Sequence, residues 1–273
     1  MDIIELALRE DIGEGDVTSA YFIDPKQTAT AVIVARESCI LAGGDVAAEV
    51  FRRVDPNLHI KILRQDGERL ERDDRVMEIF GKAAATLTAE RTALNFIQRL
   101  SGVATLTRRY VDVISGTSAV LLDTRKTTPG IRKFEKAAIV AGGGTNHRFG
   151  LFDKILVKDN HLLMISDNAL IEAIARVRKE RPDMSIELEA DTLDQVRRFA
   201  ALDGIGRILL DNMKPEQIRQ ALAFKRSELT FEASGGIDLE TIRDIAATGV
   251  DYISVGSLTY SARAMDLSLD FLV

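Results

Sequence analysis

Hydrophobic residues follow two different patterns along the chain, and the change between them falls near Ala104. Before it, short strand-like runs are separated by turn-forming residues, and one segment with helical spacing interrupts them. We therefore expect a small antiparallel α/β domain over residues 1–104, ending in connecting helices. The expected strands are TATAVIVARE, CILAGGD, HIKILRQDG and RVMEIFGK, and the expected helices are VAAEVFRRVD and the segment that starts at LTAERTALNF.

From Ser118 onward, the order strand, loop, helix repeats six times. The strands are largely apolar, which is typical of parallel strands covered by helices. Four helices have plausible first-turn residues, namely Asp167, Thr192, Pro215 and Asp238. Six consecutive units favour an α/β barrel over residues 105–273, although the pattern also allows an open doubly wound sheet. The expected strands are SAVLLDTRK, DKILVKDN, SIELEAD, GRILLDN, LTFEASGG and DYISVGS.

Composition narrows the class of protein. The apolar runs are far shorter than the ~18 residues of a membrane helix, and the acidic start MDIIELALRED lacks the features of a secretory signal. Cys39 is the only cysteine, so an internal disulfide is impossible. These features indicate a cytoplasmic protein without a membrane partner. A net charge of −6 argues against general nucleic-acid binding.

Polar residues or glycines follow all six expected strands of the second half. In a parallel barrel these positions meet at one rim, where active sites lie, so we expect a functional site there. In chain order they are Asp123, Arg125 and Lys126; Lys158 and Asp159; Glu189 and Asp191; Asp211 and Asn212; Ser234, Gly235 and Gly236; and Gly256 and Ser257.

Five cations are expected at this rim. Any one of them could pair with a surface carboxylate, but together they favour a ligand with several phosphate or carboxylate groups. They are Arg125, Lys126 and Lys158, together with His147 and Arg148 from the loop GGGTNHR.

Two acids, Glu189 and Asp211, end neighbouring strands. Carboxylates among phosphate-binding cations suggest Mg²⁺ held by oxygen ligands; neutralisation of Lys158 and binding of ribose hydroxyls remain alternatives. The glycines of SGGI and SVGS end the last two strands, where barrels often bind phosphate through backbone amides.

Several motifs are absent from the sequence. There is no GxxxxGK[ST] loop, no strand-linked GxGxxG and no GxSxG elbow, and the three histidines lack the spacing of zinc ligands. Lys158 is the one candidate for a covalent nucleophile, as a Schiff-base lysine. The expected site therefore positions and neutralises anions.

At this point the sequence resembles a known family. The strings ERTALNFIQRLSG, DTRKTTPG, EKAAIVAGGGTNHRFGL, VKDNH, ELEAD, LLDNM, EASGGI and ISVGSLT occur in the order found in quinolinate phosphoribosyltransferases. The resemblance covers nearly the whole chain. It implies an incomplete TIM-like α/β barrel with a smaller N-terminal α/β sandwich domain, to which the last residues could return. It also implies transfer of phosphoribosyl from phosphoribosyl pyrophosphate to quinolinate with decarboxylation, and a homodimer or dimer-based oligomer.

The resemblance further implies roles for matching residues. Arg125, His147 and Arg148 would hold the two carboxylates of quinolinate, and Lys126 and Lys158 would contact the substrates. The remaining assignments are Arg91 reaching the neighbouring subunit's site, Glu189 and Asp211 binding ribose hydroxyls and Mg²⁺, and the backbone of Ser234, Gly235, Gly236, Gly256 and Ser257 binding the 5′-phosphate.

Three residues depart from the family pattern, namely Ala137, Ser257 and Tyr260, and none removes a charged group. Three other interpretations remain open. One is a homologous transferase with another acceptor, such as the relatives associated with molybdenum transport. The others are a Schiff-base aldolase that uses Lys158 and a catalytically inactive barrel that binds a dicarboxylate.

Overall fold

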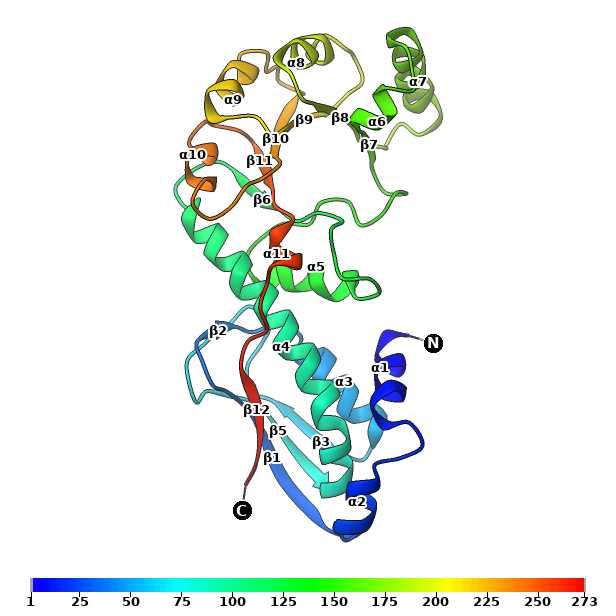
Figure 1. Cartoon of the computed structure of the whole chain (residues 1–273), viewed down its shortest axis with the longest axis vertical. Helices are drawn as coiled ribbons and strands as arrows, with labels where there is room; N and C mark the ends of the chain where they lie inside the picture. The colour runs from blue at the N-terminus through cyan, green and yellow to red at the C-terminus, as the bar shows by residue number, and fades with distance from the viewer. Residues whose placement is uncertain (1, 273) are drawn as a thin grey trace. The chain divides into compact units, whose positions relative to one another are not determined.

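The computed structural model describes residues 2–272, which form two compact units (Figure 1). Unit 1 comprises residues 1–108, 127–143 and 258–273, and unit 2 comprises residues 109–126 and 144–257. This division differs from a contiguous one after residue 104, because residues 127–143 fold with unit 1. The C-terminal residues also belong to unit 1, the return that the resemblance allowed, because the last strand pairs with the first.

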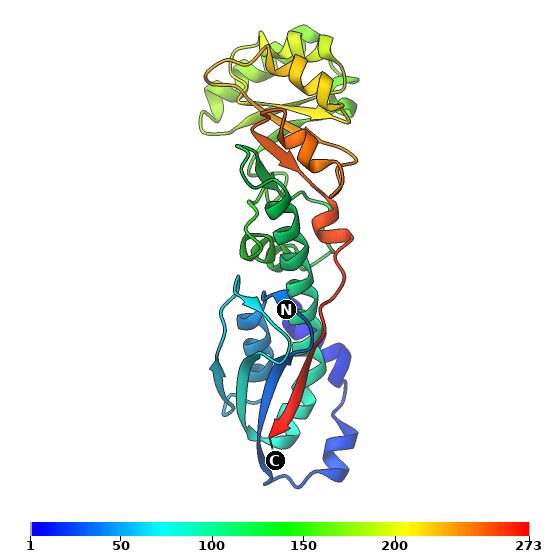
Figure 2. The ribbon, with the colours of Figure 1, turned by 90° about the vertical axis from the view of Figure 1, so that its left-hand side faces the viewer.

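Unit 1 is built on an antiparallel sheet with the strand order β12-β1-β5-β3. In Figure 2 the C-terminal strand β12 lies along β1, and their register pairs Ala31 with Phe271. The sequence pattern did not predict β12, which has only intermediate burial over most of its length. The strands are β1 (Thr28–Ala35), β3 (His59–Ile62), β5 (Arg75–Lys82) and β12 (Leu267–Leu272), and a separate two-stranded sheet pairs β2 (Cys39–Ile40) with β4 (Arg69–Leu70).

Helices cover this sheet and complete an α/β sandwich. Its buried core joins Ile33 and Ile79 of the sheet to Phe51, Leu94 and Ile97 of two helices. The expected connecting helices are one continuous helix of 31 residues that runs through residue 104. The helices are α1 (Ile3–Ile12), α2 (Val17–Phe22), α3 (Gly44–Val54), α4 (Ala83–Val113) and α5 (Arg132–Ala141).

Unit 2 is built on a six-stranded parallel sheet with the order β6-β11-β10-β9-β8-β7. From β7 to β11, each strand pairs with the next one along the chain, whereas β6 pairs with β11, as in a barrel. The two edges of the sheet are β6 and β7. The prediction of an incomplete α/β barrel is therefore confirmed. The strands are β6 (Val120–Leu122), β7 (Ile155–Val157), β8 (Ile186–Ala190), β9 (Arg207–Asp211), β10 (Thr230–Ser234) and β11 (Tyr252–Ser254).

Helices follow the strands of unit 2, and Figure 1 shows α8, α9 and α10 along one side of the sheet. Thr192 caps α8 and Pro215 is the first residue of α9, as predicted. Asp238 instead holds a turn with Thr241, so α10 begins only at Ile242. No helix among residues 2–272 is long and apolar enough to cross a membrane. The helices are α6 (Asp159–Leu162), α7 (Asp167–Glu180), α8 (Leu193–Ala200), α9 (Pro215–Leu222), α10 (Ile242–Ala246) and α11 (Ser257–Tyr260), the last crossing into unit 1.

Candidate active site at the carboxyl ends of the parallel strands

Strand alternation decides which side chains share a face of the parallel sheet. On β8, Glu187 and Glu189 lie on one face, while Leu188 lies on the other and is fully buried. The register pairs Asp211 at the end of β9 with Ser234 at the end of β10. Because the strands are parallel, these carboxyl-terminal residues lie at the same edge, which is the rim that the sequence predicts.

Three carboxylates cluster at this rim. One oxygen from each of Glu189, Asp191 and Asp211 lies within 4.8 Å of the other two. Burial raises the pKa of Glu189, and the charge of Asp211 adds to that effect while Lys158 opposes it. The Nζ of Lys158 lies 3.9 Å from Oε2 of Glu189. Burial likewise raises the pKa of Asp211. Clustered carboxylate oxygens of this kind suit a hard divalent cation.

The cations of the rim lie beside these acids and beside one another. Lys158 and Lys126 both lower the pKa of Asp211 through their charges. Burial lowers the pKa of Arg148, and the charge of Arg125 lowers it further. The guanidinium of Arg148 also donates to the backbone oxygen of Lys154 at 3.1 Å. Two partly desolvated guanidinium groups that repel each other favour a bound anion between them.

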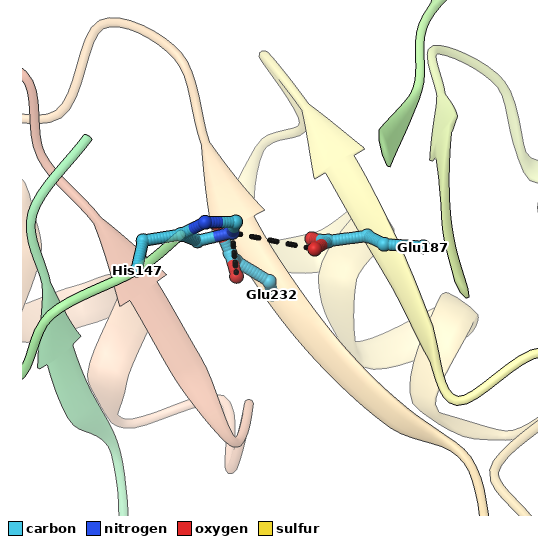
Figure 3. A group of neighbouring side chains, drawn as sticks. All are labelled: His147, Glu187 and Glu232. Carbon is cyan, nitrogen blue, oxygen red and sulfur yellow. Dashed lines mark ion pairs between the residues drawn. The ribbon is translucent and has the colours of Figure 1, made fainter. Parts of the chain in front are cut away.

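His147 points away from solvent and toward two buried glutamates. Figure 3 shows the Nε2 of its imidazole directed toward the carboxylates of both Glu187 and Glu232, and Nε2 lies 3.3 and 3.4 Å from their Oε2 atoms. Its Nδ1 accepts a hydrogen bond of 2.7 Å from the backbone N–H of Arg148. Its own backbone N–H donates to Asp123 at 2.7 Å. The imidazole is therefore held by contacts on both sides of its ring.

The pKa of His147 reflects these opposing contacts. Burial lowers it, but hydrogen bonds to Glu187 and Glu232 and the charges of both carboxylates outweigh burial, so the pKa lies above its ordinary value. The N–H of Arg148 opposes protonation at Nδ1, since that nitrogen is used as an acceptor.

A glycine turn follows β10 at the same rim. Gly235 and Gly236 have φ values of 92° and 61°, in the left-handed region that glycine tolerates best. A Cβ on Gly235 would lie 2.4 Å from Oδ1 of Asn212, so only glycine fits. Ser257, at the start of α11 just after Gly256, lies with its hydroxyl 3.2 Å from that of Tyr110. This departure from the family pattern therefore makes a hydrogen bond of its own.

The sequence analysis did not predict two buried ion pairs that lie below the rim. The Nζ of Lys154 lies 2.6 Å from Oε2 of Glu187, and Nη1 of Arg207 lies 2.6 Å from Oε2 of Glu232. Both carboxylates are fully buried. The available signal was the spacing: Glu187 and Glu232 each precede a predicted rim residue by two positions, which places them on the same face of the sheet.

Arg91 belongs to unit 1, whereas the other predicted site residues belong to unit 2. Cys39, which was not predicted as a site residue, also belongs to unit 1. Arg91 lies on α4 with a 60% exposed side chain, and its Nη2 is 3.9 Å from Glu90. Cys39 is buried, and burial raises its pKa to about 11, which disfavours the reactive thiolate. The two remaining departures, Ala137 and Tyr260, are exposed and also lie in unit 1.

Comparison with known proteins identifies the family. Residues 16–101 match the family model of the quinolinate phosphoribosyl transferase N-terminal domain, and residues 103–270 match that of its C-terminal domain. A probable carboxylating nicotinate-nucleotide pyrophosphorylase of Bacillus subtilis is 42% identical over 262 residues, covering 96% of this chain and 89% of the relative. A carboxylating nicotinate-nucleotide pyrophosphorylase of Mycobacterium leprae is 38% identical over 275 residues, covering 98% of this chain and 96% of the relative.

Solved structures show the same fold. The nicotinate-nucleotide pyrophosphorylase of Francisella tularensis superposes with a TM-score of 0.91 at 40% identity, covering 99% of this chain and 95% of that one. The family suggested by DTRKTTPG and GGGTNHR is thus supported independently by both halves of the chain and by its fold. The chain belongs to the quinolinate phosphoribosyltransferase family.

Proposed function

We propose that the protein transfers phosphoribosyl from phosphoribosyl pyrophosphate to quinolinate at the rim of unit 2, releasing pyrophosphate and CO₂ and forming nicotinate mononucleotide. The observation that carries this proposal is that a cluster of cationic side chains and a cluster of acidic side chains lie at the same rim. A cationic group contains Arg125 and Arg148, and an acidic group contains Glu189 and Asp211 with lysines beside it. The first suits a dicarboxylate, and the second suits a metal-bound diphosphate.

Quinolinate would be held by its two carboxylates. Arg125 and Arg148 are the direct contacts in this proposal, because guanidinium groups bind carboxylates in a planar, bidentate manner. Their mutual repulsion is relieved when an anion binds, which supports affinity for a doubly charged ligand. His147, which the resemblance also assigns to the carboxylates, faces Glu187 and Glu232 and would serve quinolinate binding by holding the backbone of Arg148.

Phosphoribosyl pyrophosphate would lie against Lys126, Lys158 and the glycine turn at Gly235, with Gly256 and Ser257 also near its 5′-phosphate. The cluster of Glu189, Asp191 and Asp211 fits Mg²⁺ in donor type and spacing. Bound Mg²⁺ would neutralise charge on the leaving pyrophosphate. The same carboxylates would accept hydrogen bonds from ribose hydroxyls.

In the proposed reaction, the pyridine nitrogen forms a bond to C1 of the ribose as the bond from C1 to the pyrophosphate oxygen breaks. The ring nitrogen becomes positively charged, so the ring can accept the electron pair of the C2–carboxylate bond when CO₂ leaves. A proton then replaces CO₂ at C2. The chain's residues orient the reactants and stabilise charge, and no covalent nucleophile is required.

We further propose a homodimer in which Arg91 of one subunit reaches the partner's site. The side chain of Arg91 is 60% exposed, and its Nη2 lies 3.9 Å from Oε1 of Glu90, which leaves the guanidinium accessible to a partner subunit. Large apolar side chains are also exposed in both units, and a partner subunit could cover some of them in the proposed dimer. Examples are Tyr21 and Phe22 of unit 1 and Phe152 and Met164 of unit 2.

The reaction can be tested with purified protein, quinolinate, phosphoribosyl pyrophosphate and Mg²⁺, with nicotinate as a control acceptor. We expect nicotinate mononucleotide and CO₂ from quinolinate only. The R125A variant should lose this activity, whereas R219A, which changes a half-exposed arginine on α9, should retain it. A folded protein that turns over nicotinate but not quinolinate would point to another acceptor, and one without any turnover would indicate an inactive barrel.

The dimer can be tested by subunit complementation. The R91A and K158A variants should each be inactive, but a mixed dimer contains one site with both residues intact. After unfolding and refolding of an equal mixture, we expect roughly a quarter of the wild-type activity, since half of the dimers are mixed and each holds one intact site of two. A mixture that stays inactive while forming mixed dimers would refute the shared site.

A further inference from the structure

Below the rim, charged side chains form a buried layer against the parallel sheet of unit 2. Glu187 and Glu232 are both fully buried in this layer. Burying an unpaired carboxylate is strongly unfavourable, so each of the two needs a compensating partner. Lys154 lies beside Glu187 and Arg207 beside Glu232, each with nitrogen and oxygen 2.6 Å apart.

The two ion pairs balance the charge of the layer. The guanidinium of Arg207 also stacks on the ring of Tyr252, with 3.7 Å between its central carbon and the ring centroid. His147, Glu187 and Glu232 have metal-like spacing. However, a metal ion there would add charge to carboxylates that Lys154 and Arg207 already neutralise. The layer is thus better suited to holding His147 than to binding a cation.

His147 connects this layer to the rim. Its Nε2 faces both glutamates (Figure 3). Its Nδ1 accepts a hydrogen bond from the backbone N–H of Arg148. A rotation of the imidazole away from the glutamates would break the contact with Arg148. The backbone of Arg148 is therefore oriented by carboxylates that do not themselves reach the rim.

We propose that Glu187 and Glu232 are positioning residues for the quinolinate carboxylates, acting through His147 on Arg148. This inference rests on the proposed function. The proposal assigns the buried glutamates to the binding of quinolinate and not of phosphoribosyl pyrophosphate. The reason is that the glutamates contact His147, which contacts Arg148, whereas no such chain of contacts connects them to the acidic cluster of Glu189, Asp191 and Asp211 among the described residues.

The E232Q variant tests the proposal, because glutamine preserves the size of the side chain and removes its charge. We expect the KM for quinolinate to rise about tenfold or more, as for a lost interaction of about 1.4 kcal/mol, while the KM for phosphoribosyl pyrophosphate changes less than about twofold. Calorimetric titration of quinolinate provides a readout independent of turnover. E187Q should behave in the same way.

Two further variants separate positioning from general stability. D251N removes an ion-paired carboxylate that bonds Lys225 and the backbone of Phe231 at the opposite end of the sheet; it should lower the Tm without changing the KM for quinolinate. E232Q/R207Q restores charge balance, so the Tm should recover relative to E232Q while the KM stays high. If E232Q fails to fold, this double variant carries the test.

The proposal is overturned if the KM for quinolinate is unchanged in E232Q and E187Q, or if it recovers together with the Tm in the double variant. These outcomes presuppose that the wild-type protein turns over quinolinate. A wild-type protein without that turnover would instead refute the proposed function, so the two failures are distinguishable.

Discussion

Asn212 donates a hydrogen bond of 2.6 Å from Nδ2 to Oδ2 of Asp211, and its own Oδ1 fills the space beside Gly235. Its backbone N–H also donates to the oxygen of Ser234 at 2.8 Å. Asn212 has a φ of 53°, a conformation that asparagine tolerates better than most residues. One side chain thus joins the acidic end of β9 to the glycine turn after β10.

Replacing Asn212 should therefore disturb both the acidic end of β9 and the glycine turn after β10, and weaken the binding of ligands to each. We expect N212A and N212G to bind Mn²⁺ and phosphoribosyl pyrophosphate several-fold more weakly, measured by direct titration. N212A should also lose about 1 kcal/mol more stability than N212G, since glycine tolerates positive φ and alanine does not. Equal ligand affinities in wild type and N212G would show that the amide is not needed.

Gly235 offers a test of close packing against a matched control. In G235A the new Cβ would lie 2.4 Å from Oδ1 of Asn212, whereas a Cβ on Gly249, with a similar φ of 89°, meets nothing within 4 Å. G249A should cost only the backbone strain, of order 1–3 kcal/mol. G235A should cost more and should impair phosphoribosyl pyrophosphate binding. Denaturant titration and KM measurements check both, and identical losses would contradict the packing argument.

The rim acids should reduce stability at neutral pH. Burial raises the pKa of Glu189 and of Asp211 above their unfolded values, which are near 4. The stability that protonation supplies is present below the unfolded pKa and is lost as pH rises through the folded pKa.

In metal-free buffer at pH 7–8, E189Q and D211N should therefore melt on the order of a few °C above wild type. The difference should shrink as the pH falls and vanish below the unfolded pKa values, where both groups are protonated in the folded and the unfolded state. E216Q, which changes an exposed glutamate, is the control and should show no such trend. A difference that does not change with pH would exclude titration of the rim acids as its cause.

A buried ion pair stabilises the segment that follows Lys126. Glu135 is fully buried, lies 2.8 Å from Nη2 of Arg99 and accepts the backbone N–H of Thr128 at 2.9 Å. E135A should destabilise the protein by about 3–5 kcal/mol, because it leaves Arg99 and Thr128 without this acceptor. E5A removes an exposed pair with Arg9 and should cost less than about 1 kcal/mol. Chemical unfolding compares them, and similar losses would refute the role assigned to Glu135.

The sequence was most informative where local rules and the fold agree. Thr192 and Pro215 marked helix starts because capping chemistry acts over only a few residues. It was less informative where long-range pairing decides the structure. The strand β12 has no strong alternation of burial, and it forms because β1 offers an unpaired edge.

The sequence by itself determined the order of the six parallel strands, the polar residues or glycines after each of them, and the family motifs. These follow from local periodicity and from the rule that parallel strands end at one edge. Only the tertiary structure decided that Glu187 and Glu232 enclose His147 and that Asn212 joins Asp211 to Gly235. The reason is physical: the contacts of His147 with both glutamates, and of Asn212 with Ser234 and Gly235, join residues from different strands or loops. Side-chain direction and register across the sheet bring these residues together, and local sequence specifies neither.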